Sequence, residues 1–171
     1  DSRKRRSPRD GPDHFMKLNL LCVGRMTLPY LNEGCTEFAE RLKRYTTLKI
    51  TEIKEYKTGR KLDLQKIVET EGELLTRHIP AGTFVIALDQ IGKQLGSVQL
   101  ATLMNEHMVQ GVPAWTILIG GPYGLNETLR KQADLVLSLS AMTLTHQMAR
   151  LLILEQLYRC CTIIRNEPYH H

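Results

Sequence analysis

Several features that would place a protein in a familiar class are missing from this sequence. No apolar run approaches the roughly 20 residues that a membrane-spanning helix needs, and no secretory signal precedes the cysteines. Cys22, Cys35, Cys160 and Cys161 show no C-x-x-C spacing, so neither a zinc site nor a disulfide framework is indicated. They fit reduced thiols of a cytoplasmic protein, and we expect neither a bound metal nor a membrane partner.

The common nucleotide-binding motifs are also missing. The glycine-rich segment 119–125, IGGPYGL, is not closed by the Gly-Lys-Ser/Thr of a Walker loop and lacks the G-x-G-x-x-G spacing of a dinucleotide site. An ordinary nucleoside-triphosphate or NAD enzyme is therefore disfavoured. The common open-sheet methyltransferases carry a glycine-rich loop after the first strand, whereas residues 23–26 offer the single glycine Gly24.

Length and charge set the next bounds. A chain of 171 residues is enough for one domain with a sizeable core and short for two. Of the formal charge of +5, residues 1–15 contribute five basic and three acidic side chains, which leaves +3 and only a weak hint of a polyanionic partner. We interpret residues 1–15 as a disordered or non-native leader and residues 16–171 as a single domain that starts at Met16. A basic RNA-binding arm is the alternative for the leader.

The remaining chain alternates short apolar runs with helical periodicity. Strands are predicted at 18–23, 48–53, 83–88, 115–119 and 135–139, and helices at 30–45, 62–78, 97–111 and 146–159, with Ser97 as an N-cap and a short helix before the last strand. This alternation predicts an α/β fold in which helices cover both faces of a parallel sheet. On the residues alone, the path of the chain is expected to be unknotted.

Segment 119–125 is the first candidate for a binding site. It follows a predicted strand at the carboxyl end, where open α/β sheets bind ligands, and its glycines let a ligand approach the backbone closely. The competing interpretation is a plain tight turn between a strand and a helix.

The second candidate is segment 137–147, LSLSAMTLTHQ, where a strand passes through small polar residues into a helix. Its alternating aliphatic and hydroxyl side chains could enclose an adenine ring while backbone amides bond the edge of the base. The simpler interpretation is a helix start with Thr145 as N-cap and His146 as a capping or packing histidine.

The last helix and the tail add charged and aromatic side chains. Glu155 and Arg159 are four residues apart, so they form either a surface pair that contributes about 0.2–0.5 kcal/mol or a site in which Arg159 binds a phosphate or carboxylate. In the tail, Tyr169 could stack on an unpaired base and His170 offers a proton acceptor near neutral pH.

Together these segments closely resemble one family. IGGPYG at 119–124, LSLSAMT at 137–143, HQ at 146–147, EQLYR at 155–159 and NEPYH at 166–170 stand in the order and spacing of the bacterial large-subunit ribosomal RNA methyltransferase H family. MKL at 16–18 and VIALD at 85–89 are also similar, so the resemblance covers residues 16–171.

The resemblance implies a SPOUT-type α/β fold, with a parallel sheet flanked by helices and a C-terminal trefoil knot in place of the unknotted path. It implies an S-adenosylmethionine-dependent enzyme that methylates N3 of a pseudouridine in 23S ribosomal RNA, as a homodimer on the assembled ribosome. The residues that would line the cofactor pocket are Leu88, Gly120, Gly121, Leu139, Ser140, Ala141, Met142, Thr143 and Leu144. Those that would face the RNA are His146, Arg159, Tyr169 and His170.

We predict that His170, Tyr169 and Arg159 are catalytic. His170 or Tyr169 would help to remove the imide proton, and Arg159 would stabilise negative charge on a flanking carbonyl. The sequence departs from the family at a few positions. Ala141 stands where many members carry lysine, Leu144 where many carry phenylalanine, and Thr145 where many carry proline or serine. Cys160-Cys161 replace an alanine-aromatic pair. Two alternatives stay open: a related knotted enzyme that acts on transfer RNA, and a ribosome-associated binding protein without turnover.

Overall fold

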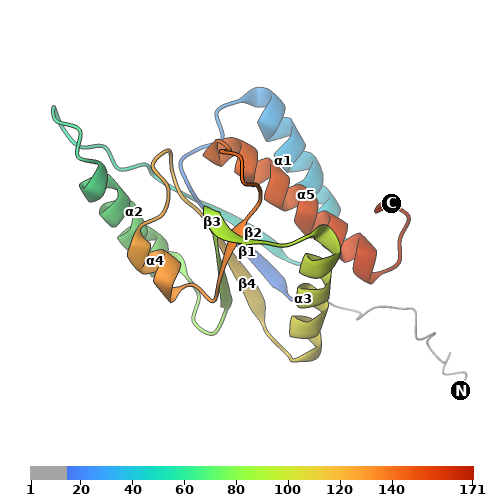
Figure 1. The fold of residues 1–171 in the computed structure, drawn as a ribbon. Coiled ribbons are helices and arrows are strands. Elements are labelled where there is room, and N and C mark those ends of the chain that lie inside the picture. Colours follow the sequence, from blue (N-terminus) through green and yellow to red (C-terminus); the bar gives the residue numbers. More distant parts are fainter. Residues whose placement is uncertain (1–14) are drawn as a thin grey trace, which may run out of the picture.

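Five parallel strands form the sheet, in the order β2-β1-β4-β3-β5 (Figure 1). The computed structural model describes residues 15–171, so the interpretation of residues 1–14 as a leader lies outside the described residues. The strands are β1 (Lys17–Val23), β2 (Leu48–Ile53), β3 (Phe84–Gln94), β4 (Ala114–Ile119) and β5 (Leu135–Ser138). The helices are α1 (Pro29–Leu42), α2 (Leu64–His78), α3 (Ser97–Val109), α4 (Glu127–Gln132) and α5 (His146–Ile164).

Helices cover both faces of the sheet, as the alternation of elements predicts (Figure 1). On one face α1, α3 and α5 pack over a large core to which β1 contributes Leu18, Leu20 and Cys22. On the other face α2 and α4 cover a smaller core to which β1 contributes Leu21 and Val23. Successive side chains of a strand point to opposite faces of the sheet, so β1 contributes to both cores. Strands β1 and β4 are therefore apolar on both sides.

The predicted elements are confirmed, but several of their ends differ: α1 ends at Leu42 instead of Tyr45, and α2 begins at Leu64 instead of Leu62. The N-cap of α3 is Gly96 instead of Ser97, because the Gln99 side chain accepts a hydrogen bond from the Gly96 amide at 2.7 Å. Helix α5 continues five residues beyond Arg159 to Ile164, and it ends before Asn166, which has a φ of 53°. Phe15, which the sequence assigns to the leader, is buried in the larger core against Tyr45.

The third strand differs most from its prediction. Instead of ending near residue 88, β3 pairs with β5 through Leu88 and then again through Lys93, opposite the same Leu137. Residues 89–92 therefore bulge out of the ladder at the carboxyl edge of the sheet. Gly92 lies so close to β5 that a Cβ atom there would come within 2.6 Å of the Val136 carbonyl oxygen.

The four cysteines are buried and free, as expected for core thiols. Burial raises the pKa of the Cys22 thiol to about 12, so it is not a reactive nucleophile at neutral pH. Among residues 15–171, no helix is long and apolar enough to cross a membrane. In the same range no group of three or more potential ligands from His, Cys, Asp and Glu is placed to hold a metal ion.

Candidate functional site: a glycine-lined cavity at the carboxyl edge of the sheet

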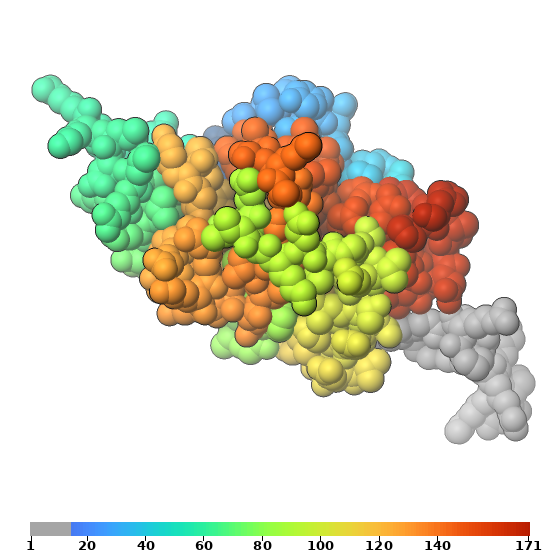
Figure 2. Space-filling model, viewed as in Figure 1, coloured from blue at the N-terminus to red at the C-terminus, as the bar shows by residue number. Residues whose placement is uncertain are grey.

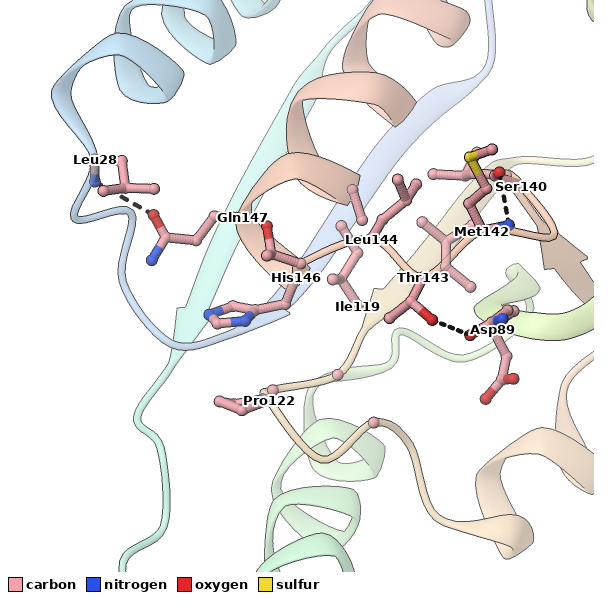
Figure 3. A pocket seen from close by; sticks show the side chains of 18 residues that line it. Leu28, Asp89, Ile119, Pro122, Ser140, Met142, Thr143, Leu144, His146 and Gln147 are labelled. Carbon is pink, nitrogen blue, oxygen red and sulfur yellow. Dashed lines mark hydrogen bonds between the residues drawn. The ribbon is translucent and has the colours of Figure 1, made fainter.

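A cavity of about 710 Å³ opens where β3, β4 and β5 end (Figure 3). Its walls come from residues 88–90 at the bulge of β3, from the segments that follow β4 and β5, from Leu28 before α1 and from the first turn of α5. Figure 3 shows Leu144, Ile119 and Pro122 around the same space, although they come from distant parts of the sequence. Loops after parallel strands meet at one edge of the sheet, which is why ligands bind there.

A tight glycine turn after β4 forms one wall. The Gly124 amide donates to the Gly121 carbonyl oxygen at 3.0 Å, and Gly124 has a φ of 81° that favours glycine. A Cβ atom on Gly120 would lie 2.6 Å from the carbonyl carbon of Gly124, so the two backbones touch. The segment is thus a tight turn that also forms a wall of the cavity, and its part in ligand binding stays a prediction.

The opposite wall is segment 139–145, which joins β5 to α5. The Ser140 hydroxyl accepts a hydrogen bond from the Met142 amide at 2.9 Å. Gln90, in the bulge of β3, accepts from the Thr143 hydroxyl at 3.0 Å and donates to the Ala141 carbonyl oxygen at 2.8 Å. These bonds fix segment 139–145 to the β3 bulge. Gln90 therefore positions the segment that is predicted from the sequence to enclose an adenine ring.

The structure brings together almost all the residues predicted to bind the cofactor. The cavity is lined by Leu88, Gly120, Gly121, Leu139, Ser140, Met142, Thr143 and Leu144. Ala141 does not line it. Five further lining residues, Ile119, Pro122, Gly124, Thr145 and Gln147, belong to the two candidate segments but were not assigned to the cofactor. The sequence reasoning missed Leu28, Asp89, Gln90 and Ala149. Asp89 and Gln90 could have been found, since polar residues directly after a parallel strand lie at the ligand-binding edge.

The first turn of α5 ties the cavity to the loop before α1. Thr145 is the N-cap, with its hydroxyl accepting from the Met148 amide at 3.2 Å. The Gln147 side chain accepts from the amides of Thr27 and Leu28, at 3.1 and 3.3 Å. Gln147 therefore holds Leu28 in the cavity wall, a role that its sequence position did not predict.

His146 lines the cavity beside Glu55, with its Nε2 atom 4.0 Å from the Glu55 carboxylate. Burial lowers the pKa of His146, Arg150 lowers it further, and Glu55 opposes both. His146 is consequently a neutral imidazole at neutral pH, able to accept a proton or a hydrogen bond. Because Thr145 provides the cap, the capping interpretation of His146 does not hold.

A second cluster forms where the tail folds back on α5, and Glu155 is its centre. One Glu155 carboxylate oxygen accepts from Arg159 Nη2 at 2.5 Å, from Arg159 Nε at 3.1 Å and from the Tyr169 hydroxyl at 3.1 Å. The Arg159 guanidinium also lies over the Tyr169 ring, 4.8 Å from its centroid. The Glu155–Arg159 ion pair is half-buried and holds the tail against α5, so it is not the exposed surface pair of the simpler interpretation.

The contacts of the tail assign hydrogen-bonding roles to Tyr169 and His170. Burial and the Glu155 carboxylate raise the pKa of Tyr169, so its phenol stays protonated and donates to Glu155. Arg159 Nη1 lies 3.1 Å from His170 Nδ1, and a guanidinium can only donate. Nδ1 of His170 is therefore the acceptor, and in the neutral ring the proton is on Nε2.

One chain does not bring all the predicted RNA-facing residues together. His146 stands at the start of α5 and Arg159 thirteen residues later, which is about 20 Å along a helix that rises 1.5 Å per residue. Arg159, Tyr169 and His170 are together at one end of α5, and His146 is with the cavity at the other.

Glu71 is a buried carboxylate behind the glycine turn, and the sequence reasoning missed it. It is 2% exposed, and its Oε2 atom accepts from the Tyr56 amide at 3.1 Å. Its Oε1 atom has no hydrogen-bond partner among the described residues and would lie 3.2 Å from a Cβ atom on Gly121. Burial raises the pKa of Glu71, Glu55 raises it further, and the Tyr56 amide opposes both.

The raised pKa means that ionised Glu71 weakens folding. The cost is absent below the ordinary pKa of glutamate, grows as pH rises and is complete above the folded-state pKa. Glu71→Gln removes the charge and can keep the Tyr56 bond, so we expect it to raise the free energy of unfolding by about 1 kcal/mol near pH 8 and hardly at all near pH 4. Urea denaturation at both pH values measures this, and an equal change at both would contradict it. Glu73→Gln, at an exposed site on α2, is the control.

A cavity of this size, walled by a glycine turn at the carboxyl edge of a parallel sheet, defines an α/β protein that binds a small molecule. The sequence narrows the class. Residues 16–170 match the model of the family described as "Predicted SPOUT methyltransferase", and the chain belongs to that family.

Curated relatives match along nearly their whole length. A protein of Syntrophotalea carbinolica named "Ribosomal RNA large subunit methyltransferase H" is 53% identical over 156 residues, which is 91% of this chain and 99% of the relative. A protein of Trichlorobacter lovleyi with the same name is 42% identical, over 91% of this chain and 100% of the relative.

Solved structures are more distant. A probable methylase family protein from Haemophilus influenzae superposes with a TM-score of 0.49 at 14% identity, over 92% of this chain and 71% of that one. The family assignment rests on the sequence matches.

Proposed function

We propose that this protein is an S-adenosylmethionine-dependent methyltransferase of large-subunit ribosomal RNA, acting in the cytoplasm on N3 of a pseudouridine in 23S RNA of the assembled ribosome. The observation that carries the proposal is the cavity between the glycine turn and segment 139–145, in a chain of the SPOUT methyltransferase family. The names of the relatives from S. carbinolica and T. lovleyi support the RNA substrate.

The residues around the cavity suit this cofactor. Its volume of about 710 Å³ is within the range of small-molecule sites. Gly120 and Gly121 expose backbone to the space, while Leu139 and Leu144 offer aliphatic surface for a planar base. A bound S-adenosylmethionine supplies a methyl group on a positively charged sulfur. The chain's part is to hold that group in line with the RNA atom, and alignment is the larger contribution that we expect to the rate.

We infer that the chain is knotted at this cavity. Residues 89–92 bulge from the sheet and the strand then pairs with β5 a second time. Gln90, inside that bulge, bonds to both Ala141 and Thr143 of the segment that leads into α5. A path in which segment 139–145 is threaded past the β3 bulge of residues 89–92 accounts for both observations.

The acceptor nitrogen must lose an imide proton, and four side chains are our candidates for contact with the base. His146 is neutral and lines the cavity, which suits a hydrogen bond to the base. Arg159, with its permanent charge, suits a carbonyl on which negative charge develops. His170 can take the proton at Nδ1 only after its contact with Arg159 opens. Tyr169 is a protonated phenol, so it can take the proton only if it passes its own to the Glu155 carboxylate that it contacts.

We also propose that the protein acts as a homodimer in which the tail of one copy completes the cavity of the other. The proposal is supported by the separation of about 20 Å along α5 between His146 and Arg159. A two-fold pair of antiparallel α5 helices would bring the tail cluster of one copy to the cavity of its partner, and the same contact would occur twice.

The experiment that tests the proposed function uses labelled S-adenosylmethionine and ribosomes from cells that lack the modification. We expect label in 23S RNA, and nucleoside analysis should recover it as N3-methylpseudouridine. Transfer RNA and free 23S RNA serve as alternative acceptors in parallel reactions. Label in transfer RNA would favour the related enzyme class, and cofactor binding without transfer to any RNA would favour a binding protein.

A further inference from the structure

Eight residues of the loop that joins β2 to α2, beside the cavity, hold the entire excess positive charge of residues 16–171, and Asp63 at the end of this loop is the N-cap of α2. Between β2 and α2, residues 54–61 carry the cations Lys54, Lys57, Arg60 and Lys61 against the single anion Glu55, a net charge of +3. Residues 16–171 as a whole also carry +3, so the rest of this range is neutral. A charge that is weak when averaged over the chain is therefore concentrated in eight residues.

The four cations are exposed, and the loop that carries them projects from the body of the molecule (Figures 1 and 2). None of the four forms an ion pair with a described residue, whereas Arg41, Lys43 and Lys131 are paired with glutamates of their own helices. A Cβ atom added to Gly59, near the tip, would meet no other atom within 4 Å, so the loop packs against nothing there. Four like charges held together against the single carboxylate of Glu55 repel each other, and an anionic partner would relieve the repulsion.

The base of the loop is joined to the cavity. Glu55 lies 4.0 Å from His146, which lines the cavity. The next residue, Tyr56, donates its amide to Glu71, whose other oxygen faces Gly121 of the glycine turn. A loop of eight residues that leaves and returns can extend about 13 Å from its base. Its cations are thus within reach of the nucleotides that flank a base bound at the cavity.

We propose that the loop of residues 54–61 is the surface that binds ribosomal RNA, through phosphates next to the target nucleotide. The inference rests on the proposed function, and it identifies the surface that provides most of the protein's affinity for the RNA substrate. Contacts between cationic side chains and phosphates carry no sequence information, so the loop would position the RNA while the cavity selects the nucleotide. RNA fits better than an acidic protein because the same loop adjoins a site for a nucleotide base.

The test compares two variants that each lose four positive charges. The first replaces Lys54, Lys57, Arg60 and Lys61 with glutamine. The matched control replaces Lys17, Arg44, Lys49 and Arg77, which are exposed at the opposite edge of the sheet. Binding to the large subunits of undermodified, assembled ribosomes is measured over a range of salt, together with cofactor affinity and methyl transfer.

We expect the loop variant to bind subunits about 100-fold more weakly near physiological salt, and the slope of log Kd against log salt to fall by about 3, since each phosphate contact contributes about 0.7–0.9. Cofactor affinity should not change in either variant, and the control should keep the affinity and slope of the unsubstituted protein. An unchanged slope in the loop variant, an equal loss in the control, or no binding by the unsubstituted protein would overturn the proposal.

The same measurements separate this inference from the proposed function. If the unsubstituted protein binds subunits through the loop but transfers no methyl group, the proposed function fails and the loop proposal stands. If methyl transfer occurs and the loop variant binds and reacts normally, the function stands and the loop proposal fails.

Discussion

Replacing Gly120 with alanine is expected to weaken S-adenosylmethionine binding by about 100-fold, because the glycine turn has to shift by a fraction of an ångström or more. The new Cβ atom would lie 2.6 Å from the carbonyl carbon of Gly124, 2.7 Å from its oxygen and 2.9 Å from the Leu125 nitrogen. All three are backbone atoms, which cannot move aside as a flexible side chain can. Calorimetric titration with the cofactor measures the loss.

Gly96→Ala is the matched control for this substitution. A Cβ atom on Gly96 would meet only the Gln99 side chain, at 3.5 Å, and its backbone has a φ of −71° that alanine adopts freely. We expect the control to bind the cofactor normally, and thermal unfolding should show that both variants fold. Normal binding by Gly120→Ala would mean that the glycine turn does not contact the cofactor.

The residues that form the core are largely predictable from the sequence, because periodicity reports burial directly. Apolar runs at 18–23 and 115–119 are fully or mostly buried strands, and the helices lie where the period of 3.6 places them. The extension of β3 to Gln94 could not be read in the same way. Residues 89–94 are polar and glycine-bearing, and they join the sheet only because β5, some 45 residues later, pairs with both sides of the bulge.

The candidate site was predictable where family motifs cover it and unpredictable where it depends on long-range contacts. The glycine turn and segment 139–144 are each an unbroken stretch of sequence, so a motif can identify each of them. Gln90 contacts residues 51 and 53 positions away, and Gln147 holds a loop about 120 positions away. Single polar residues of this kind have no pattern of their own, so only the folded chain reveals their partners.

The tail illustrates a different limit. The sequence indicated that Arg159, Tyr169 and His170 belong together, and the structure places them in one cluster. It did not indicate that Glu155 engages two of them, or that the cluster and the cavity occupy opposite ends of α5. The four-residue spacing predicts that Glu155 and Arg159 meet on the helix. Whether Tyr169 also bonds to Glu155 depends on how the tail folds back.

Replacing Arg159 with lysine is expected to reduce methyl transfer by about 100-fold while cofactor affinity stays unchanged. The guanidinium contacts Glu155 through Nε and Nη2 and His170 through Nη1 at the same time. A lysine keeps the charge but has one nitrogen, so it cannot hold the tail and face the RNA together. Single-turnover methylation of ribosomes measures the rate.

Arg41→Lys is a suitable control for this change, since Arg41 also pairs with a glutamate four residues away, Glu37, and that pair is exposed. We expect its transfer rate to remain normal. If Arg159→Lys lowered the cofactor affinity as well as the transfer rate, the substitution would act by disturbing the fold of α5. The predicted catalytic role of Arg159 would then be wrong.

Mixing the two impaired variants tests the proposed homodimer, at a cofactor concentration far below the Kd of Gly120→Ala, where each variant alone is almost inactive. Gly120→Ala damages the cavity and Arg159→Lys damages the tail, at opposite ends of the same helix α5. If each site combines the cavity of one copy with the tail of the other, a mixed dimer has one site with both defects and one intact site. Random exchange of subunits then restores about a quarter of the normal number of sites, whereas each variant alone stays inactive. If the cavity and tail act within one chain, every site in the mixture carries one defect and activity does not return.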